Sequence, residues 1–165
     1  MTVAGTGNGP PPQLAAGCLD LLRARGETLA TAESLTAGLI SARLAEVPGA
    51  SDVLRGGLVA YATDVKTSVL GVPSEVVERY GAVSAACAEA MATRALAVFG
   101  SDWAVAATGV AGPDLQEGRP AGTVYVAVAG PGDVRTQKLG LDGGRGEIRA
   151  ATVDAVLALL EAALA

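Results

Sequence analysis

Few residues in this sequence can accept a proton near neutral pH, because it contains no histidine and only two lysines, Lys66 and Lys138. A hydrolase of this composition must draw its general base from Lys, Asp, Glu, Tyr or a bound metal. Ser34 lies where a strand-like segment gives way to a helical one, and Lys66 closes the segment that begins at Tyr61. A serine hydroxyl and a neutral lysine amine form a workable nucleophile and base, which predicts a Ser34/Lys66 pair.

Each of these two residues also has a plainer interpretation. Ser34 is suited to capping a helix N-terminus, and Lys66 is suited to a solvated helix face. Arginine outnumbers lysine ten to two in a chain rich in Ala, Gly and Val, a bias that a GC-rich genome produces without a functional cause. Spacing alone therefore leaves both interpretations open.

Length and composition predict one folded domain. With 165 residues, half of them apolar, the chain can bury a single core. We expect residues 1–12, rich in Gly, Pro and Thr, to form a disordered leader before a domain spanning residues 13–165. The leader lacks the pattern of a secretory signal, and no apolar run reaches the roughly 18 residues of a membrane span. We therefore expect a cytoplasmic protein with no membrane partner.

The net charge and the two cysteines indicate which partners and cofactors to expect. A net charge of −5 and an aromatic content of 3% offer no basic, stacking surface, so no nucleic-acid partner is expected. Cys18 and Cys87 fall within helical patterns without cysteine or histidine neighbours, which predicts buried core residues rather than metal ligands. We expect neither a metal nor an organic cofactor. Homo-oligomerisation remains open.

Apolar spacing, caps and glycines predict alternating helices and strands. Helices are expected at residues 12–25, 35–45, 63–70, 74–79 and 84–99. A last helix is expected to begin after residue 146 and to end at residue 164. Strands are expected at residues 28–32, 58–61, 103–108, 123–129 and 134–141. Ser74 and Ser84 are predicted N-caps, and Gly130 to Gly132 is a predicted hairpin turn. This order predicts an α/β fold, a single-domain, three-layer α/β/α sandwich on a mixed sheet.

Loops at the carboxyl ends of strands are the usual ligand sites of such sheets. Three segments have this character: residues 33–36, residues 108–112, and residues 143–145 before the last helix. They offer free backbone N–H groups, hydroxyls and a guanidinium, which together suit an oxyanion or a phosphate. The glycines match neither GxGxxG nor a P-loop, so a nicotinamide-redox or NTPase site has little support.

Seven motifs, taken in order, resemble the C-terminal domain of the competence/damage-inducible protein CinA. They are Thr31 to Gly38, Val47 to Ser51, Gly56 to Tyr61 with Lys66, Leu70 to Pro73, Tyr80 to Ser84, Ala107 to Pro113 and Pro120 to Tyr125. The resemblance runs from about Leu14 to Leu164. Stand-alone proteins similar to that domain are nicotinamide-mononucleotide (NMN) amidohydrolases, so the resemblance implies deamidation of NMN to nicotinate mononucleotide.

The resemblance also implies roles for individual residues. Ser34 matches the family's catalytic serine and Lys66 its lysine, and Tyr61 alongside them is expected as a third catalytic residue that relays the proton or orients the pair. Arg145 matches an arginine suited to a phosphate. The remaining expected substrate-binding residues, in the segments after the first and third strands, are Glu33, Leu35, Thr36, Thr108, Gly109 and Gly112. We expect NMN as the small-molecule partner and no second, nucleotide-hydrolase-like domain.

Some residues depart from the family's common pattern. Leu35 and Ala37 stand where relatives commonly have Cys and Gly, and Thr63 replaces an Asn before the lysine. These changes keep two alternatives open: a non-catalytic nucleotide-binding or regulatory module, and an interaction protein in competence or DNA repair. The acidic net charge argues against a DNA-binding version of the second.

Overall fold

The computed structural model describes residues 13–165, so the predicted leader at residues 1–12 lies outside the described residues. Helices and strands alternate along the chain, as the apolar spacing predicts. In order they are α1 (Gln13–Arg25), β1 (Leu29–Glu33), α2 (Leu39–Ala45), the 3-10 helix η1 (Ala50–Asp52), β2 (Leu54–Val59), α3 (Thr63–Ser68), α4 (Ser74–Tyr80), α5 (Ala85–Phe99), β3 (Trp103–Gly109), β4 (Thr123–Gly130), β5 (Asp133–Gly140) and α6 (Arg145–Leu164).

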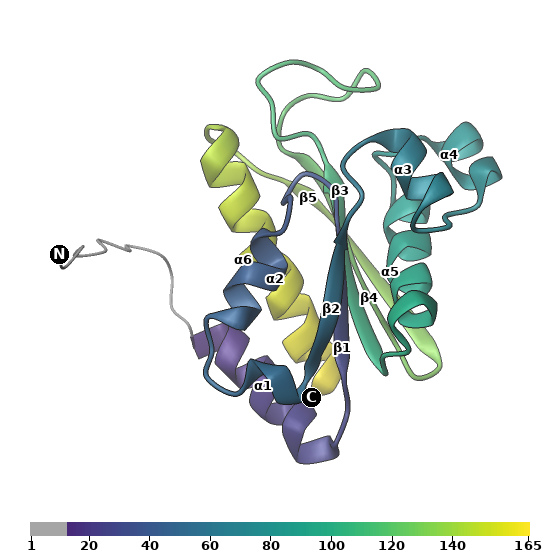
Figure 1. Cartoon of the computed structure of the whole chain (residues 1–165). Helices are drawn as coiled ribbons and strands as arrows, with labels where there is room; N and C mark the ends of the chain where they lie inside the picture. The colour runs from purple at the N-terminus through teal and green to yellow at the C-terminus, as the bar shows by residue number, and fades with distance from the viewer. Residues whose placement is uncertain (1–12) are drawn as a thin grey trace, which may run out of the picture.

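The strands form one mixed sheet in the order β2-β1-β3-β4-β5. Strand β1 is parallel to both β2 and β3, whereas β4 is antiparallel to β3 and to β5. Helices α1, α2 and α6 lie on one face of the sheet and α3, α4 and α5 on the other (Figure 1). The predicted α/β/α sandwich and its antiparallel hairpin are confirmed.

Two hydrophobic cores flank the sheet. Leu19, Leu22 and Leu157 belong to the core beneath α1, α2 and α6, which also contains Cys18. The core beneath α5 contains Cys87 and many alanines, whose small side chains let this helix lie close to the strands. Both cysteines are fully buried, which confirms their predicted place. Within residues 13–165, no helix has the length and apolarity to cross a membrane.

Strand β2 begins earlier than predicted, and helix α4 has a different N-cap. The second strand was expected at residues 58–61, but β2 spans Leu54–Val59 and runs through two glycines. Pro73, not Ser74, is the N-cap of α4, and no side chain caps it. Ser84 does cap α5, because its hydroxyl accepts a hydrogen bond of 3.1 Å from the Cys87 N–H.

The turn after β1 sets the orientation of Ser34. Helix α2 begins at Leu39 rather than at residue 35, and its N-cap is Gly38. Ala37 and Gly38 both have positive φ, +47° and +97°, so the backbone makes a tight turn between strand and helix. Ser34 therefore does not cap the helix, which removes its plainer interpretation.

Candidate functional site

Lys66 and Ser34 meet at the edge where the parallel strands end. Lys66 belongs to α3 and is only 2% exposed, and its Nζ donates a hydrogen bond of 2.9 Å to Ser34 Oγ. The same nitrogen donates to the carbonyl oxygens of Ala60, at 2.9 Å, and Tyr61, at 3.3 Å. These three partners satisfy an ammonium, which has three N–H groups, and equally a neutral amine, whose two N–H groups donate to the carbonyls while its lone pair accepts from the Ser34 hydroxyl. The interpretation of Lys66 as a solvated residue is wrong.

The surroundings of Lys66 favour its neutral form. Burial lowers the pKa of its ammonium below the ordinary value of 10.5, against an opposing influence of the Cys87 thiol and the Glu117 carboxylate. Burial also raises the pKa of Cys87 to about 11, so this thiol is uncharged near pH 7. The Glu117 carboxylate is then the charge that opposes deprotonation of Lys66.

Glu33 holds the turn that carries Ser34. Its carboxylate is fully buried and accepts hydrogen bonds from the N–H groups of Gly38 and Ile40, both at 3.0 Å, and of Ser41, at 2.8 Å. The carboxylate of the preceding strand thus satisfies the first N–H groups of α2. The sequence predicts Glu33 as a substrate-binding residue, but the structure places its carboxylate inside the fold, against α2.

A hydroxyl cluster completes the surroundings of that carboxylate. Ser41 Oγ donates to Glu33 Oε1 at 2.8 Å, and the Ser41 and Thr31 hydroxyls lie 2.6 Å apart. A Cβ at Gly57 would overlap both hydroxyls. Glycine at this position lets β2 lie against the cluster, which is the physical reason that a strand continues through a residue usually depleted in strands.

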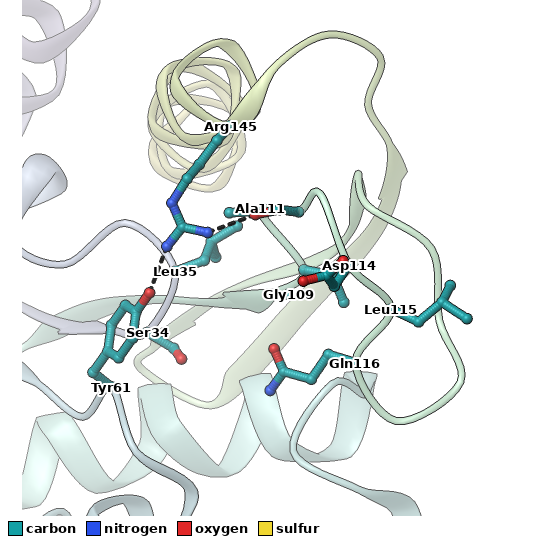
Figure 2. Close-up of a pocket in the computed structure, with 11 residues that line it drawn as sticks. Ser34, Leu35, Tyr61, Gly109, Ala111, Asp114, Leu115, Gln116 and Arg145 are labelled. Carbon is teal, nitrogen blue, oxygen red and sulfur yellow. Dashed lines mark hydrogen bonds between the residues drawn. The ribbon is translucent and has the colours of Figure 1, made fainter.

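A pocket of about 310 Å³ opens beside Ser34. Ser34 and Leu35 come from the turn after β1, Tyr61 follows β2, and Arg145 begins α6 (Figure 2). The remaining wall is supplied by residues between 109 and 116, which end β3 and enter the loop to β4. Among the expected binding residues, the pocket lining therefore contains Leu35, Gly109, Gly112 and Arg145.

The loop wall also contains residues that the sequence did not identify. They are Asp114, Leu115 and Gln116, whereas Val110 and Ala111 lie within the expected segment 108–112. The only signal for the first three was their place between glycines and just before a predicted strand, because no charge or apolar pattern distinguishes this segment.

Arg145 connects two sides of the pocket. Its guanidinium donates from Nη1 to the Gly112 carbonyl oxygen and from Nη2 to the Tyr61 hydroxyl, both at 2.7 Å (Figure 2). The residue is exposed and stands at the first turn of α6, where backbone N–H groups also point outward. A guanidinium in this position can bind an anion that enters the pocket.

Two expected binding residues are buried away from the pocket lining. Thr108 is 1% exposed and its hydroxyl donates to the Ala82 carbonyl oxygen at 2.7 Å. Thr36 is fully buried, its hydroxyl has no partner within residues 13–165, and its carbonyl oxygen accepts from Arg149. Within the same residues, no three acidic, cysteine or histidine side chains gather where they could hold a metal ion.

Backbone N–H groups also belong to the residues that line the pocket. Those of Leu35, directly after Ser34, and Ala111 donate to no protein acceptor in the described part of the chain. Such groups stabilise negative charge that develops on an oxygen. The site thus combines a hydroxyl, a buried amine, unpaired N–H donors and a guanidinium.

Comparison with known proteins gives the same family as the motifs. The CinA C-terminal domain model matches residues 12–164. A CinA-like protein of Frankia casuarinae is 44% identical over 162 residues, covering 98% of this chain and 37% of that protein. A CinA-like protein of Synechococcus sp. is 47% identical over 150 residues, covering 89% of this chain and 36% of that protein. The chain thus spans just over a third of the length of these curated relatives.

Solved structures share the fold closely. The competence damage-inducible protein A (ComA) from Klebsiella pneumoniae is 36% identical with a TM-score of 0.90, covering 93% of this chain and 96% of that one. The competence/damage inducible protein CihA from Agrobacterium tumefaciens is 38% identical with a TM-score of 0.90, covering 96% of this chain and 99% of that one. With the family model matching nearly the whole folded chain, this protein belongs to the CinA C-terminal domain family.

Proposed function

We propose that this protein is an amidohydrolase that converts NMN and water to nicotinate mononucleotide and ammonia. The observation that carries the proposal is the buried Lys66 Nζ, 2.9 Å from Ser34 Oγ, beside a pocket bordered by an arginine. The lowered pKa of Lys66 supports its role as a base. A cytoplasmic location, as the sequence predicts, belongs to the same proposal.

The first half of the reaction forms an ester with Ser34. Neutral Lys66 accepts the hydroxyl proton while Ser34 Oγ attacks the carboxamide carbon. The carbonyl oxygen becomes an oxyanion, for which the N–H groups of Leu35 and Ala111 are the candidate donors. The protonated Lys66 then gives its proton to the amide nitrogen, the C–N bond breaks, and ammonia leaves.

The second half restores the enzyme. A water molecule replaces ammonia beside Lys66, which takes one of its protons as the hydroxide attacks the ester carbon. The second tetrahedral intermediate collapses, the C–O bond to Ser34 breaks, and Lys66 returns the proton to Ser34 Oγ. One amide and one water thus give one carboxylic acid and one ammonia, which exchange a proton in solution.

Arg145 and the size of the pocket support a phosphorylated ligand. A guanidinium binds a phosphate with two parallel hydrogen bonds, and each Nη of Arg145 has a second N–H besides the one that it donates to Gly112 or Tyr61. The pocket volume of about 310 Å³ is at the lower end of the roughly 300–1,000 Å³ common for small-molecule sites, which suits a compact ligand. Tyr61, bonded to Arg145, orients this side.

The departures from the family pattern are compatible with catalysis. Leu35 contributes an apolar surface to the pocket, and its N–H is unaffected by side-chain identity. Ala37 adopts a φ of +47°, a conformation in which glycine is unstrained, so this change costs stability without occupying the pocket. Thr63 begins α3 and leaves the Lys66 contacts in place.

Ammonia release from NMN tests the proposal, with nicotinamide and nicotinamide riboside as comparison substrates. We expect NMN to be the preferred substrate. Ser34→Ala should lower kcat by several orders of magnitude, because the nucleophile is removed. Lys66→Arg should be almost inactive although it keeps the positive charge, because a guanidinium does not deprotonate in proteins.

Lys138→Arg is the matched control, since Lys138 is exposed on β5. It should retain full activity. Substantial turnover by Ser34→Ala would contradict the assignment of the nucleophile. NMN that raises the melting temperature but is never hydrolysed would instead favour a non-catalytic nucleotide-binding module, and salt-sensitive DNA binding would favour an interaction protein.

A further inference from the structure

Glu117 occupies a strained turn in the loop that forms the pocket wall. Gln116 and Arg119 exchange both backbone hydrogen bonds, at 3.1 and 2.9 Å, so Glu117 and Gly118 are the two central residues of a tight hairpin. Both have left-handed backbone angles, with φ of +52° and +71°. Such turns favour Asn, Asp or Gly, and a glutamate there is strained. Strain of this kind persists only where surrounding contacts hold it.

The contacts that hold Glu117 come from the segment before α5. Its Oε1 accepts from the Ala82 N–H at 2.9 Å and its Oε2 accepts from the Val83 N–H at 3.0 Å. A Cβ on Gly81 would lie 2.6 Å from Oε2, so this segment leaves close-fitting space for the carboxylate. Each oxygen has its own donor, which fixes the side chain in direction as well as in distance.

Glu117 does not line the pocket itself, but its hydrogen bonds hold a loop whose other residues do. Asp114, Leu115 and Gln116 line the pocket and lead directly into the anchored turn. The loop extends beyond the end of the sheet (Figure 1), and most of its residues are exposed. An exposed loop without a core of its own opens easily unless specific bonds hold it. The Glu117 carboxylate also acts electrostatically on Lys66.

We propose that Glu117 is a positioning residue: its carboxylate, bound to the N–H groups of Ala82 and Val83, fixes the loop wall against which the ligand binds. Its effect on turnover rests on the proposed NMN hydrolysis, whereas the anchoring itself does not. Because Glu117 is hydrogen-bonded to the segment that holds the wall and acts on Lys66 only electrostatically, its loss should weaken substrate binding more than it slows chemistry.

Amide hydrogen exchange on the full-length protein tests the anchor without any substrate. Glu117→Ala should accelerate exchange about tenfold at the amides of Ala82 and Val83, and also at those of Gln116 and Arg119, because the loop opens locally. Glu75→Gln, which removes an exposed carboxylate from α4, is the control and should change none of these rates. Unchanged exchange in Glu117→Ala would overturn the proposal.

Steady-state kinetics with NMN then test positioning. Glu117→Ala should raise KM about tenfold with kcat within about threefold, and Glu117→Gln, which keeps one acceptor oxygen, should recover part of the loss. An unchanged KM, or an equal loss in kcat alone, would overturn the positioning role. A wild-type protein that leaves NMN intact would overturn the proposed function only, because the exchange result still decides whether Glu117 anchors the loop.

Discussion

Two loops at the same edge of the sheet are each held by a glutamate, and the two glutamates differ in burial. Glu33 holds the turn of Ser34 from inside the fold, where it is fully buried and accepts three backbone N–H groups of the α2 region. Glu117 holds the pocket loop from the surface, where it is exposed and accepts two. The turn of Ser34 and the pocket loop are thus attached by carboxylates that differ in burial.

Burial makes the Glu33 carboxylate harder to replace than that of Glu117, because water can take over the hydrogen bonds of an exposed carboxylate only. When a buried carboxylate is removed, its donors lose their partner and gain none, which costs the full desolvation of each group. When an exposed carboxylate is removed, solvent satisfies the same donors. The side of the site that needs a fixed geometry, the Ser34/Lys66 pair, is therefore attached to the core. The loop side of the pocket is attached at the surface.

The largest expected effect on stability follows from removing the buried carboxylate of Glu33. Glu33→Ala should lower the free energy of unfolding by about 3–5 kcal/mol, because three N–H groups and two hydroxyls lose a buried acceptor. Glu117→Ala should lower it by less than about 1 kcal/mol. Urea unfolding of the two variants measures both values. Equal losses would show that burial does not distinguish the two anchors.

The next largest effect on stability is expected at Gly57, which leaves space for the hydroxyls around Glu33. Gly57→Ala should destabilise the protein by about 2–3 kcal/mol, because its Cβ would overlap the Thr31 and Ser41 hydroxyls. Gly146→Ala is the matched control, since nothing lies near its Cβ position in the first turn of α6. It should stabilise the protein by up to about 1 kcal/mol through helix propensity. Thermal unfolding would reveal whether Gly57 is as tolerant as Gly146.

The buried side should also respond to alkaline pH. The folded-state pKa of Lys66 lies below its unfolded value of 10.5, so between these values the unfolded chain binds more protons than the folded one. The free energy of unfolding should therefore gain a contribution that rises with pH across that window, by at most about 1.4 kcal/mol per pH unit. Lys66→Met should remove this contribution, whereas Lys138→Met, at an exposed site, should leave it.

The pH dependence of activity should also follow from the deprotonation of Lys66. If Lys66 is the base, kcat/KM should rise with pH through an apparent pKa below 10.5, because only the neutral amine accepts the Ser34 proton. A pH profile of NMN hydrolysis between neutral and alkaline pH measures it. A profile that falls over this range would point to a required ammonium and sink the role of Lys66 as a base.

The smallest expected effect concerns the turn between Glu33 and α2. Ala37→Gly should stabilise the protein by about 0.5 kcal/mol, because relief of the left-handed strain exceeds the added entropy of the unfolded chain only slightly. Differential scanning calorimetry can resolve the change, with kcat expected to stay the same. A loss of stability would mean that the Ala37 side chain contributes packing that offsets its strain.

The sequence predicted the Ser34/Lys66 pair better than it predicted the residues that line the pocket around the pair. Ser34 and Lys66 were identified from residue type and motif, although 32 positions separate them and only folding brings their side chains within a hydrogen bond. Glu33 and Thr108 were expected to bind substrate because they adjoin residues that line the pocket, but the structure places both side chains inside the fold. Successive side chains of a strand point to opposite faces, so a neighbour in sequence points away from the ligand.

Local patterns in the sequence determined the order of helices and strands, the hairpin, the Ser84 cap and the burial of both cysteines, because periodicity and capping act within a few residues. Tertiary structure alone decided that Lys66 is desolvated, that Glu33 faces inward and that Glu117 bonds to the segment before α5. Each of these depends on contacts between segments far apart in the chain, and both desolvation and hydrogen-bond satisfaction arise only when such segments exclude water together.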